Sequence, residues 1–119
     1  MTECFQDYGH SKLFGYKRNA NGRHYLGRFT LKETDDKFEI WALGVAEEYR
    51  HKGYATHMLT EFLSQFKSEK PLVLYVYKAN KIAIRLYKKV GFTIVGQCYF
   101  TSKAYTMQYM KGSGNHEKS

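Results

Sequence analysis

The sequence is poor in cysteine and contains no long hydrophobic run. Its two cysteines, Cys4 and Cys98, form neither a CxxC pair nor a cluster with metal-ligand spacing, so we expect two reduced thiols and no metal. The longest apolar runs, such as residues 40–45, are far too short to cross a bilayer. Residues 1–4 lack the basic head and apolar stretch of a signal peptide. We therefore expect a soluble, cytoplasmic protein without a membrane partner.

Acidic residues are also in deficit. Only 11 Asp and Glu stand against 19 Lys and Arg, which gives a formal net charge of +8. This charge suits nucleic acid, a phosphorylated cofactor or an acidic surface, and it is also consistent with a merely soluble basic protein. No nucleic-acid-binding motif is present, and the 11 tyrosines fall within strand patterns rather than in an exposed stacking row. Nucleic acid is therefore the less favoured partner.

Strand patterns fill the first part of the chain. Residues 1–11 have no clear period and are expected to be irregular. Apolar, aromatic and β-branched residues predict three strands, at 12–18, 23–33 and 38–45. Turn residues, including an Asn-Gly pair, separate these strands at 19–22 and 34–37. Three strands joined by short turns predict an antiparallel meander.

Helical and strand patterns alternate in the remainder. Apolar residues recur at helical spacing from Ala55 to Phe66, which predicts an amphipathic helix. Residues 72–77 form a continuous apolar run, which is typical of a strand buried on both faces in parallel pairing. Asn80 is expected to cap a second helix that ends at Gly91. The last two strands are predicted at 92–99 and 104–111.

These elements follow the order β-β-β-α-β-α-β-β. They predict a single domain of the α/β (α+β) class, with a mixed central sheet and helices packed on it. The domain is expected to cover residues 1–111. Residues 112–119 are polar and contain glycine, so they are expected to form a flexible tail.

The junction between the third strand and the first helix carries a candidate anion site. Residues 50–55 read Arg-His-Lys-Gly-Tyr-Ala. The first turn of a helix has unpartnered N–H groups and positive potential, and Gly53 would let a pyrophosphate approach the backbone closely. The segment lacks the spacing of a P-loop and the three glycines of a dinucleotide fingerprint. From these residues alone, an ordinary helix start with a glycine in its entry turn stays an alternative.

Two longer motifs resemble the GNAT family of N-acetyltransferases. Val45 followed by residues 50–59 is similar to the Arg/Gln-x-x-Gly-x-Gly/Ala signature for acetyl-CoA. Residues 80–92 are similar to the family's Asn-x-x-Ala-x-x-Leu-Tyr-x-x-x-Gly-Phe block. Both lie on the expected elements in the expected order, and the resemblance runs from about Lys12 to Lys111. It implies an acetyl-CoA-dependent enzyme that moves an acetyl group directly to an amine within a ternary complex.

The resemblance also implies roles for particular residues. Backbone groups of a splayed strand would meet the pantetheine arm, the N–H groups of residues 51–56 would hold the pyrophosphate, and Asn80 would reach the cofactor from the second helix. Tyr87 would donate a proton to the departing thiolate, although it could instead be plain core. The cofactor-binding residues implied are Leu43, Gly44, Val45, Arg50, His51, Lys52, Gly53, Tyr54, Ala55, Thr56 and Asn80.

The general base is less clearly marked. Glu39 aligns with the base position of the histone-acetyltransferase branch of the family, where a buried carboxylate would accept the amine proton through water. The alternative is a strand-edge glutamate that faces solvent. His51 and His57 are poorer candidates, because we expect both to face solvent or phosphate. The basic run from Lys78 to Lys89 is interpreted mainly as a solvated helix face.

The chain departs from the family before its first meander strand. Members usually begin with a strand and two helices. Only about eleven residues precede the first meander strand here, so this chain is expected to lack the leading strand and both helices. Because those helices form a wall of the acceptor site, the acceptor amine stays open: a protein lysine or N-terminus, or a small molecule. A second subunit in a homodimer would be another source of that wall. A catalytically weak or inactive acetyl-CoA-binding module is the alternative to an enzyme.

Overall fold

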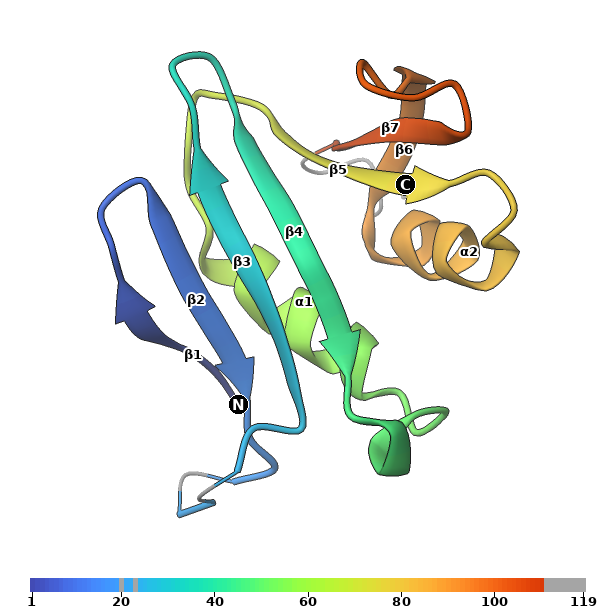
Figure 1. Ribbon diagram of the computed structural model, residues 1–119. Helices are drawn as coiled ribbons and strands as arrows, with labels where there is room; N and C mark the ends of the chain where they lie inside the picture. Colours follow the sequence, from blue (N-terminus) through green and yellow to red (C-terminus); the bar gives the residue numbers. More distant parts are fainter. Residues whose placement is uncertain (20, 23, 111–119) are drawn as a thin grey trace, which may run out of the picture. The chain divides into compact units, whose positions relative to one another are not determined.

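The computed structural model describes residues 1–19, 21–22 and 24–110. Seven strands and two α-helices confirm the α/β class and the predicted order of elements from the first meander strand onward. The elements separate into two compact units, residues 1–70 and the residues from 71 onward, which are described one at a time (Figure 1). Within the described residues, every helix is too short or too polar to traverse a lipid bilayer.

The first unit is a four-stranded antiparallel sheet with one helix on it. Its strands pair in the order β1-β2-β3-β4, so the predicted meander is confirmed. Hydrogen bonds from Gly22 N–H to the Asn19 carbonyl and from Thr34 N–H to the Lys37 carbonyl close the two predicted turns. The elements are β1 (Thr2–Asp7), β2 (Ser11–Tyr16), β3 (Gly27–Glu33), β4 (Phe38–Val45), the 3-10 helix η1 (Glu47–Tyr49) and α1 (Tyr54–Gln65).

The N-terminal segment corrects a prediction. Residues 2–7, expected to be irregular, form β1, and only residues 8–10 connect it to β2. The alternation is hidden in the sequence because a bulge interrupts the register between Cys4 and Gln6. Phe5, the extra residue, stacks its ring on Tyr25 with 4.6 Å between centroids. The expected absence of a leading strand is therefore wrong, while no helix lies between β1 and β2.

Strand β3 begins later than the predicted residue 23, which itself lies outside the described residues. The Leu26 N–H donates to the Tyr16 carbonyl at 2.7 Å, and the regular ladder starts only at Gly27. The ring of Tyr25 occupies the space beside Gly15, where an added Cβ would meet Tyr25 Cδ1 at 2.3 Å. Tyr25 therefore packs its ring on the sheet beside Gly15 and does not extend strand β3.

Helix α1 buries its apolar side against the sheet, as the periodicity predicts. Met58 and Leu59 are fully buried, and Phe62 packs its ring 5.0 Å from that of Phe29 on β3. Phe14 on β2 stacks on Phe29 at 5.1 Å, which extends this aromatic core. Burial of each such side chain contributes about 1.5–3 kcal/mol. The core therefore fixes α1 across the strands that carry the candidate site (Figure 1).

The second unit is a three-stranded antiparallel sheet with α2 packed against β6. Its strands pair in the order β5-β7-β6, and Leu74, Phe92 and Met107 form its core. Gly91 ends α2 with a φ of 116°, as the sequence predicts. The last strands stop two residues short of the predicted ends, and Lys111 and the expected tail lie outside the described residues. The elements are β5 (Leu72–Tyr77), α2 (Lys81–Val90), β6 (Phe92–Gln97) and β7 (Ala104–Tyr109).

Candidate active site

The end of β4 is distorted by a β-bulge. Arg28 on β3 pairs with Gly44 while Thr30 pairs with Trp41, so β4 holds one extra residue between these pairs. Ala42 adopts a φ of 55°, a left-handed conformation that costs a non-glycine residue about 1–3 kcal/mol. Bulges re-aim the backbone and release it from the ladder. Ala42 was missed by the sequence reasoning, because no glycine or proline marks this position.

Two residues predicted to meet the cofactor's pantetheine arm lie beside this bulge. Gly44 is exposed, and an added Cβ would meet no atom within 4 Å. The carbonyl of Val45 accepts a hydrogen bond from Arg50 Nε at 3.0 Å. Arg50 therefore ties the loop that follows η1 back to the end of β4. This contact gives Arg50 a structural role besides the phosphate contact expected of it.

The loop before α1 has an unusual backbone. His51 has a φ of 65° and Gly53 a φ of 81°, whereas Lys52 between them is not left-handed. Alternation of this kind turns successive N–H groups to one side and forms a concavity suited to an anion. His51, Lys52 and Gly53 are all exposed, as is His57 on the next turn. The loop thus presents its backbone to solvent.

The first turn of α1 has no protein cap. Among the residues that the structure describes, no side chain accepts from its N–H groups, and the turn itself contains no acidic residue. The first backbone bond joins His57 N–H to the Gly53 carbonyl, which leaves the earlier groups, those of Tyr54, Ala55 and Thr56, outside the helix's own ladder. These N–H groups and the helix dipole favour a bound anion.

This geometry fits a pyrophosphate such as that of acetyl-CoA. An added Cβ at Gly53 would lie 3.9 Å from His57 Cδ2, so the protein itself leaves the space above Gly53 open. The positive φ favours glycine there, and the absence of a Cβ would let a ligand approach the backbone closely. The predicted residues from Arg50 to Thr56 form one continuous segment that runs from the end of η1 into the first turn of α1, and we call this segment the cradle.

Tyr54, the first residue of α1, is held by a residue that sequence reasoning missed. Arg18, in the loop after β2, donates from Nη2 to the Tyr54 hydroxyl at 3.1 Å and lies 5.8 Å from the centre of its ring. The Tyr54 ring also packs near Tyr16 and Tyr49, with centroids 5.8 and 6.3 Å away. Arg18 therefore positions the start of α1. No motif marks it, because the contact spans 36 residues.

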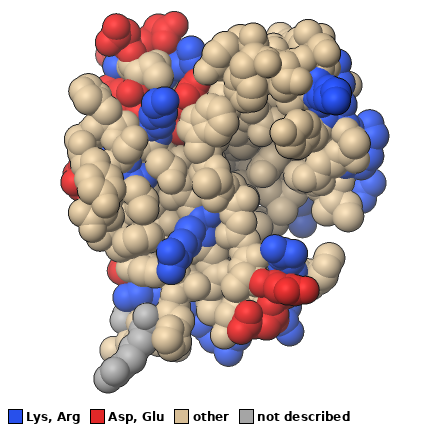
Figure 2. All heavy atoms as spheres, viewed as in Figure 1, with Lys and Arg blue, Asp and Glu red and all other residues tan. Residues whose placement is uncertain are grey.

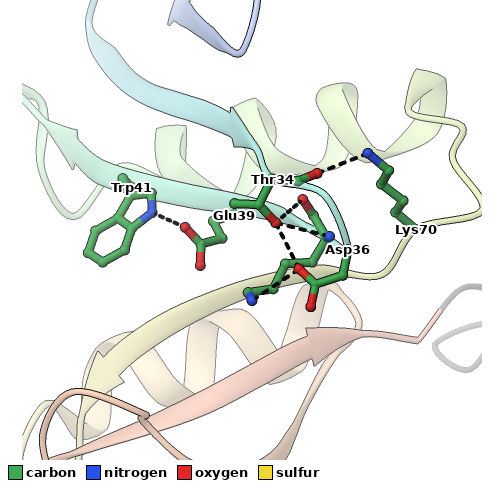
Figure 3. A network of polar contacts seen from close by, with 6 residues as sticks. Thr34, Asp36, Glu39, Trp41 and Lys70 are labelled. Carbon is green, nitrogen blue, oxygen red and sulfur yellow. Dashed lines mark hydrogen bonds and ion pairs between the residues drawn. The ribbon is translucent and has the colours of Figure 1, made fainter.

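Glu39 is buried, with 3% of its surface exposed. The alternative of a solvent-facing glutamate is therefore wrong. Its carboxylate accepts a hydrogen bond from Trp41 Nε1 at 2.8 Å, and both side chains project from the same face of β4 (Figure 3). A buried carboxylate held by an indole is a group that can take up a proton in a defined place. Trp41 was not anticipated as its partner.

Asn80 acts as a helix cap. Its Oδ1 accepts from the Ala83 N–H at 3.1 Å at the start of α2, as predicted. Because this oxygen is used within the helix, only the amide NH₂ is left to reach a cofactor. Asn80 belongs to the second unit, and its expected cofactor contact stays a prediction.

Tyr87 lies on α2, where it is partly buried with its ring 6.2 Å from that of Phe92. Burial raises the pKa of its phenol above the ordinary value of about 10. The hydroxyl therefore holds its proton through neutral pH, as a proton donor must. The ring contact makes Tyr87 part of the packing, and its role as the proton donor stays a prediction.

Metal-ligating residues do not gather in the described part of the chain. No three His, Cys, Asp or Glu side chains there are placed to hold an ion. Cys4 is exposed and Cys98 is buried, and each is a free thiol.

The chain belongs to the acetyltransferase (GNAT) family, whose profile matches residues 1–92. Mycothiol acetyltransferases from two corynebacteria are similar to it. The protein from Corynebacterium aurimucosum is 32% identical over 75 residues, which cover 61% of this chain and 24% of that protein. The protein from Corynebacterium efficiens is 34% identical over 65 residues, or 53% and 22% of the two chains. The matched segments thus span about a quarter of these relatives.

Solved structures share the fold across both units. A spermidine N-acetyltransferase SpeG chimera from Vibrio cholerae and hSSAT has a TM-score of 0.69 and 19% identity, covering 87% of this chain and 71% of that chain. PaiA N-acetyltransferase from Thermoplasma acidophilum, in complex with coenzyme A, has a TM-score of 0.68 and 22% identity. The match covers 84% of this chain and 60% of that chain. Arabidopsis thaliana NAA60 with acetyl-CoA has a TM-score of 0.64 and 20% identity, covering 85% and 76%. The predicted GNAT fold is confirmed.

Proposed function

We propose that this chain is an acetyl-CoA-dependent N-acetyltransferase that passes an acetyl group directly to an amine within a ternary complex. The observation that carries the proposal is the uncapped start of α1, where left-handed Gly53 precedes three N–H groups, those of residues 54–56, that the helix's own ladder does not use. Structures of the same fold are known with coenzyme A and with acetyl-CoA, which supports this ligand for the cradle.

Each group of the site has a separate task in this proposal. Residues 51–56 hold the pyrophosphate through backbone N–H groups, with Arg50 and Lys52 adding positive charge. Leu43, Gly44 and Val45 bind the pantetheine arm along β4, and the Asn80 amide adds a contact. Bound acetyl-CoA supplies an activated acetyl thioester.

Proton movements are assigned to the two remaining residues. Glu39 takes the proton from the acceptor ammonium, directly or through water, so that the nitrogen lone pair can form the new C–N bond. Backbone N–H groups freed at the bulge stabilise the negative charge on the acetyl oxygen. When the C–S bond breaks, Tyr87 donates its proton to the sulfur. The proton that the attacking nitrogen still carries passes to the Tyr87 phenolate, which leaves a neutral amide. The products are an amide and free coenzyme A, with no covalent enzyme intermediate.

The acceptor is proposed only as an amine. A spermidine N-acetyltransferase is among the proteins with this fold, and its name supports nitrogen as the acetylated atom. A protein lysine, an N-terminus and a small-molecule amine are all consistent with the site. A homodimer and a cytoplasmic location stay predictions, as does a single domain over residues 1–111.

Calorimetric titration with acetyl-CoA tests the cradle. We expect micromolar binding by the wild type and none by Gly53→Glu, because a carboxylate would occupy the cradle and repel the pyrophosphate. Gly9→Glu is the matched control: Gly9 also has a positive φ of 89° and open space around it, but lies in the turn between β1 and β2. An equal loss of acetyl-CoA affinity in both variants, or no acetyl-CoA binding by the wild type, would contradict the proposal.

A thiol-release assay over a panel of amines tests catalysis. Tyr87→Phe should lower kcat by about 10²–10⁴-fold while acetyl-CoA still binds. Because the Tyr87 pKa is raised, loss of the phenolic proton should depress wild-type kcat only above about pH 10. Binding without release of coenzyme A on any amine would favour the inactive acetyl-CoA-binding module instead.

A further inference from the structure

Positive charge is divided unequally between the two units. Residues 1–70 hold 11 Lys and Arg against 10 Asp and Glu, whereas residues 71–119 hold eight Lys and Arg against a single acidic residue, Glu117. Seven of the eight net positive charges therefore belong to the second unit. Its described part, residues 71–110, contains six Lys and Arg and no acidic residue at all. The part of this unit in view in Figure 2 accordingly shows blue atoms and no red ones.

Four of these cations share the outer face of α2. Lys81, Arg85, Lys88 and Lys89 are all exposed, and their spacing of three and four residues places them side by side along about 12 Å of helix. Ile82 lies next to Lys81 with 69% of its surface exposed. We call these five residues the basic face. Its partner must match both its charge and this single apolar side chain.

Helix stability accounts for only part of the basic face: Lys88 and Lys89 lie in the last turn of α2, where the helix dipole favours cations, but the other two cations gain nothing from it. Lys81 and Arg85, and likewise Arg85 and Lys89, are like charges four residues apart, an arrangement that destabilises a helix. Lys81 also stands in the first turn, where the helix dipole favours anions. Within the described residues none of the four cations forms an ion pair, whereas Lys17 and Lys70 of the first unit pair with Glu3 and Glu33 at 3.1 and 2.8 Å.

We propose that the basic face is the docking surface for an acidic segment of a partner protein. Carboxylates repeated every four residues on a partner helix would match the cations in spacing and sign, and an apolar side chain among them would cover Ile82. The interaction does not depend on the proposed acetyl transfer, because no cradle residue takes part in it.

Two other polyanions fit the surface less well. Single-stranded nucleic acid would need aromatic rings beside the cations. The exposed rings of Tyr99 and Phe100 pack on Tyr75 of β5, and among the described residues no exposed aromatic ring lies on α2 itself. An anionic membrane would need an apolar surface larger than one isoleucine.

Fluorescence anisotropy with a labelled helical peptide tests the proposal. The probe carries glutamates at four-residue spacing and one central leucine, at about 50 mM salt to limit screening. Arg85→Glu/Lys89→Glu should weaken binding by about tenfold or more, and Ile82→Ser by about threefold. The matched control, Lys32→Glu/Lys67→Glu, makes the same charge change at exposed sites of the first unit and should stay within about twofold of wild type.

Three results would overturn the proposal. Equal weakening by the control would mean that net charge alone attracts the peptide. Tighter, Arg85- and Lys89-dependent binding of a DNA duplex, or of vesicles containing phosphatidylserine, would assign the face to nucleic acid or to a membrane. Absence of peptide binding by the wild type, with circular dichroism confirming that it is folded, would leave the face as solvated surface.

Discussion

The two helices of this protein begin in opposite ways. Asn80 closes the start of α2, because its side chain accepts from the Ala83 N–H. The start of α1 has no such side chain, no acidic residue in its first turn, and a left-handed glycine at position 53. Helix α2 follows β5 after residues 78–80, whereas η1 and the loop with left-handed His51 and Gly53 separate α1 from β4. A capped helix start uses its polar groups for folding, while an uncapped and exposed one keeps them for a ligand.

The largest effect is expected from a side chain added at the uncapped start of α1. Gly53→Asn introduces a polar side chain that tolerates the left-handed conformation. We expect acetyl-CoA to bind at least about tenfold more weakly, because the side chain occupies space that the pyrophosphate needs, while stability falls by less than about 1 kcal/mol. Calorimetry and thermal unfolding measure the two effects. Unchanged affinity would show that the cradle is not the binding site, and Gly9→Asn controls for the backbone.

The reverse experiment opens the start of α2. Asn80→Ala removes the cap and should cost about 1 kcal/mol of folding free energy, or about 4 °C in Tm. Asn80→Asp keeps an oxygen in place and should restore most of that stability. If Asn80→Asp binds acetyl-CoA as tightly as wild type, the residue serves folding alone. A selective loss of affinity in this stable variant would support the cofactor contact expected from the family motif.

A smaller effect on acetyl-CoA binding is expected when the contact between Arg18 and Tyr54 at the start of α1 is removed. Arg18→Gln removes the contacts to the hydroxyl and ring of Tyr54. Because both lie at an exposed site, the loss of stability should not exceed about 1 kcal/mol. We expect a weakening of acetyl-CoA binding of about twofold to fivefold, because the first turn of α1 is less firmly placed. Tyr54→Phe should reproduce only the hydrogen-bond part of this change, and an effect larger than that of Arg18→Gln would contradict the assignment.

Local patterns were sufficient to predict most of the fold. Helix α1 could be located because residues 55–66 repeat their apolar residues at helical spacing, and α2 because Asn80 and Gly91 mark its ends. Strand β1 was missed because its bulge at Phe5 breaks the two-residue alternation on which strand prediction depends. The start of β3 was placed four residues early because Tyr25 is a good strand residue whose ring is used for packing on Gly15.

In the candidate site too, local sequence patterns predict only the features that have a local cause. The cradle could be predicted, since glycine at a strand-to-helix junction has a local physical reason. The left-handed Ala42, the Arg18–Tyr54 contact and the Trp41–Glu39 bond could not, because each depends on how distant or bulged backbone is arranged. The burial of Glu39 likewise follows from tertiary packing, so the sequence left its two interpretations open.

The bulge in β1 also bears on aggregation. β1 stands at one end of the strand order and pairs with β2 alone among the described strands, so its outer side could recruit a strand from a second molecule. The extra residue at Phe5 breaks the row of backbone donors and acceptors, and Glu3 and Asp7 place negative charge along the same edge. Edge-to-edge joining of two copies at β1 is thereby discouraged. Deleting Phe5 would straighten this edge and leave a protein more prone to form fibrils.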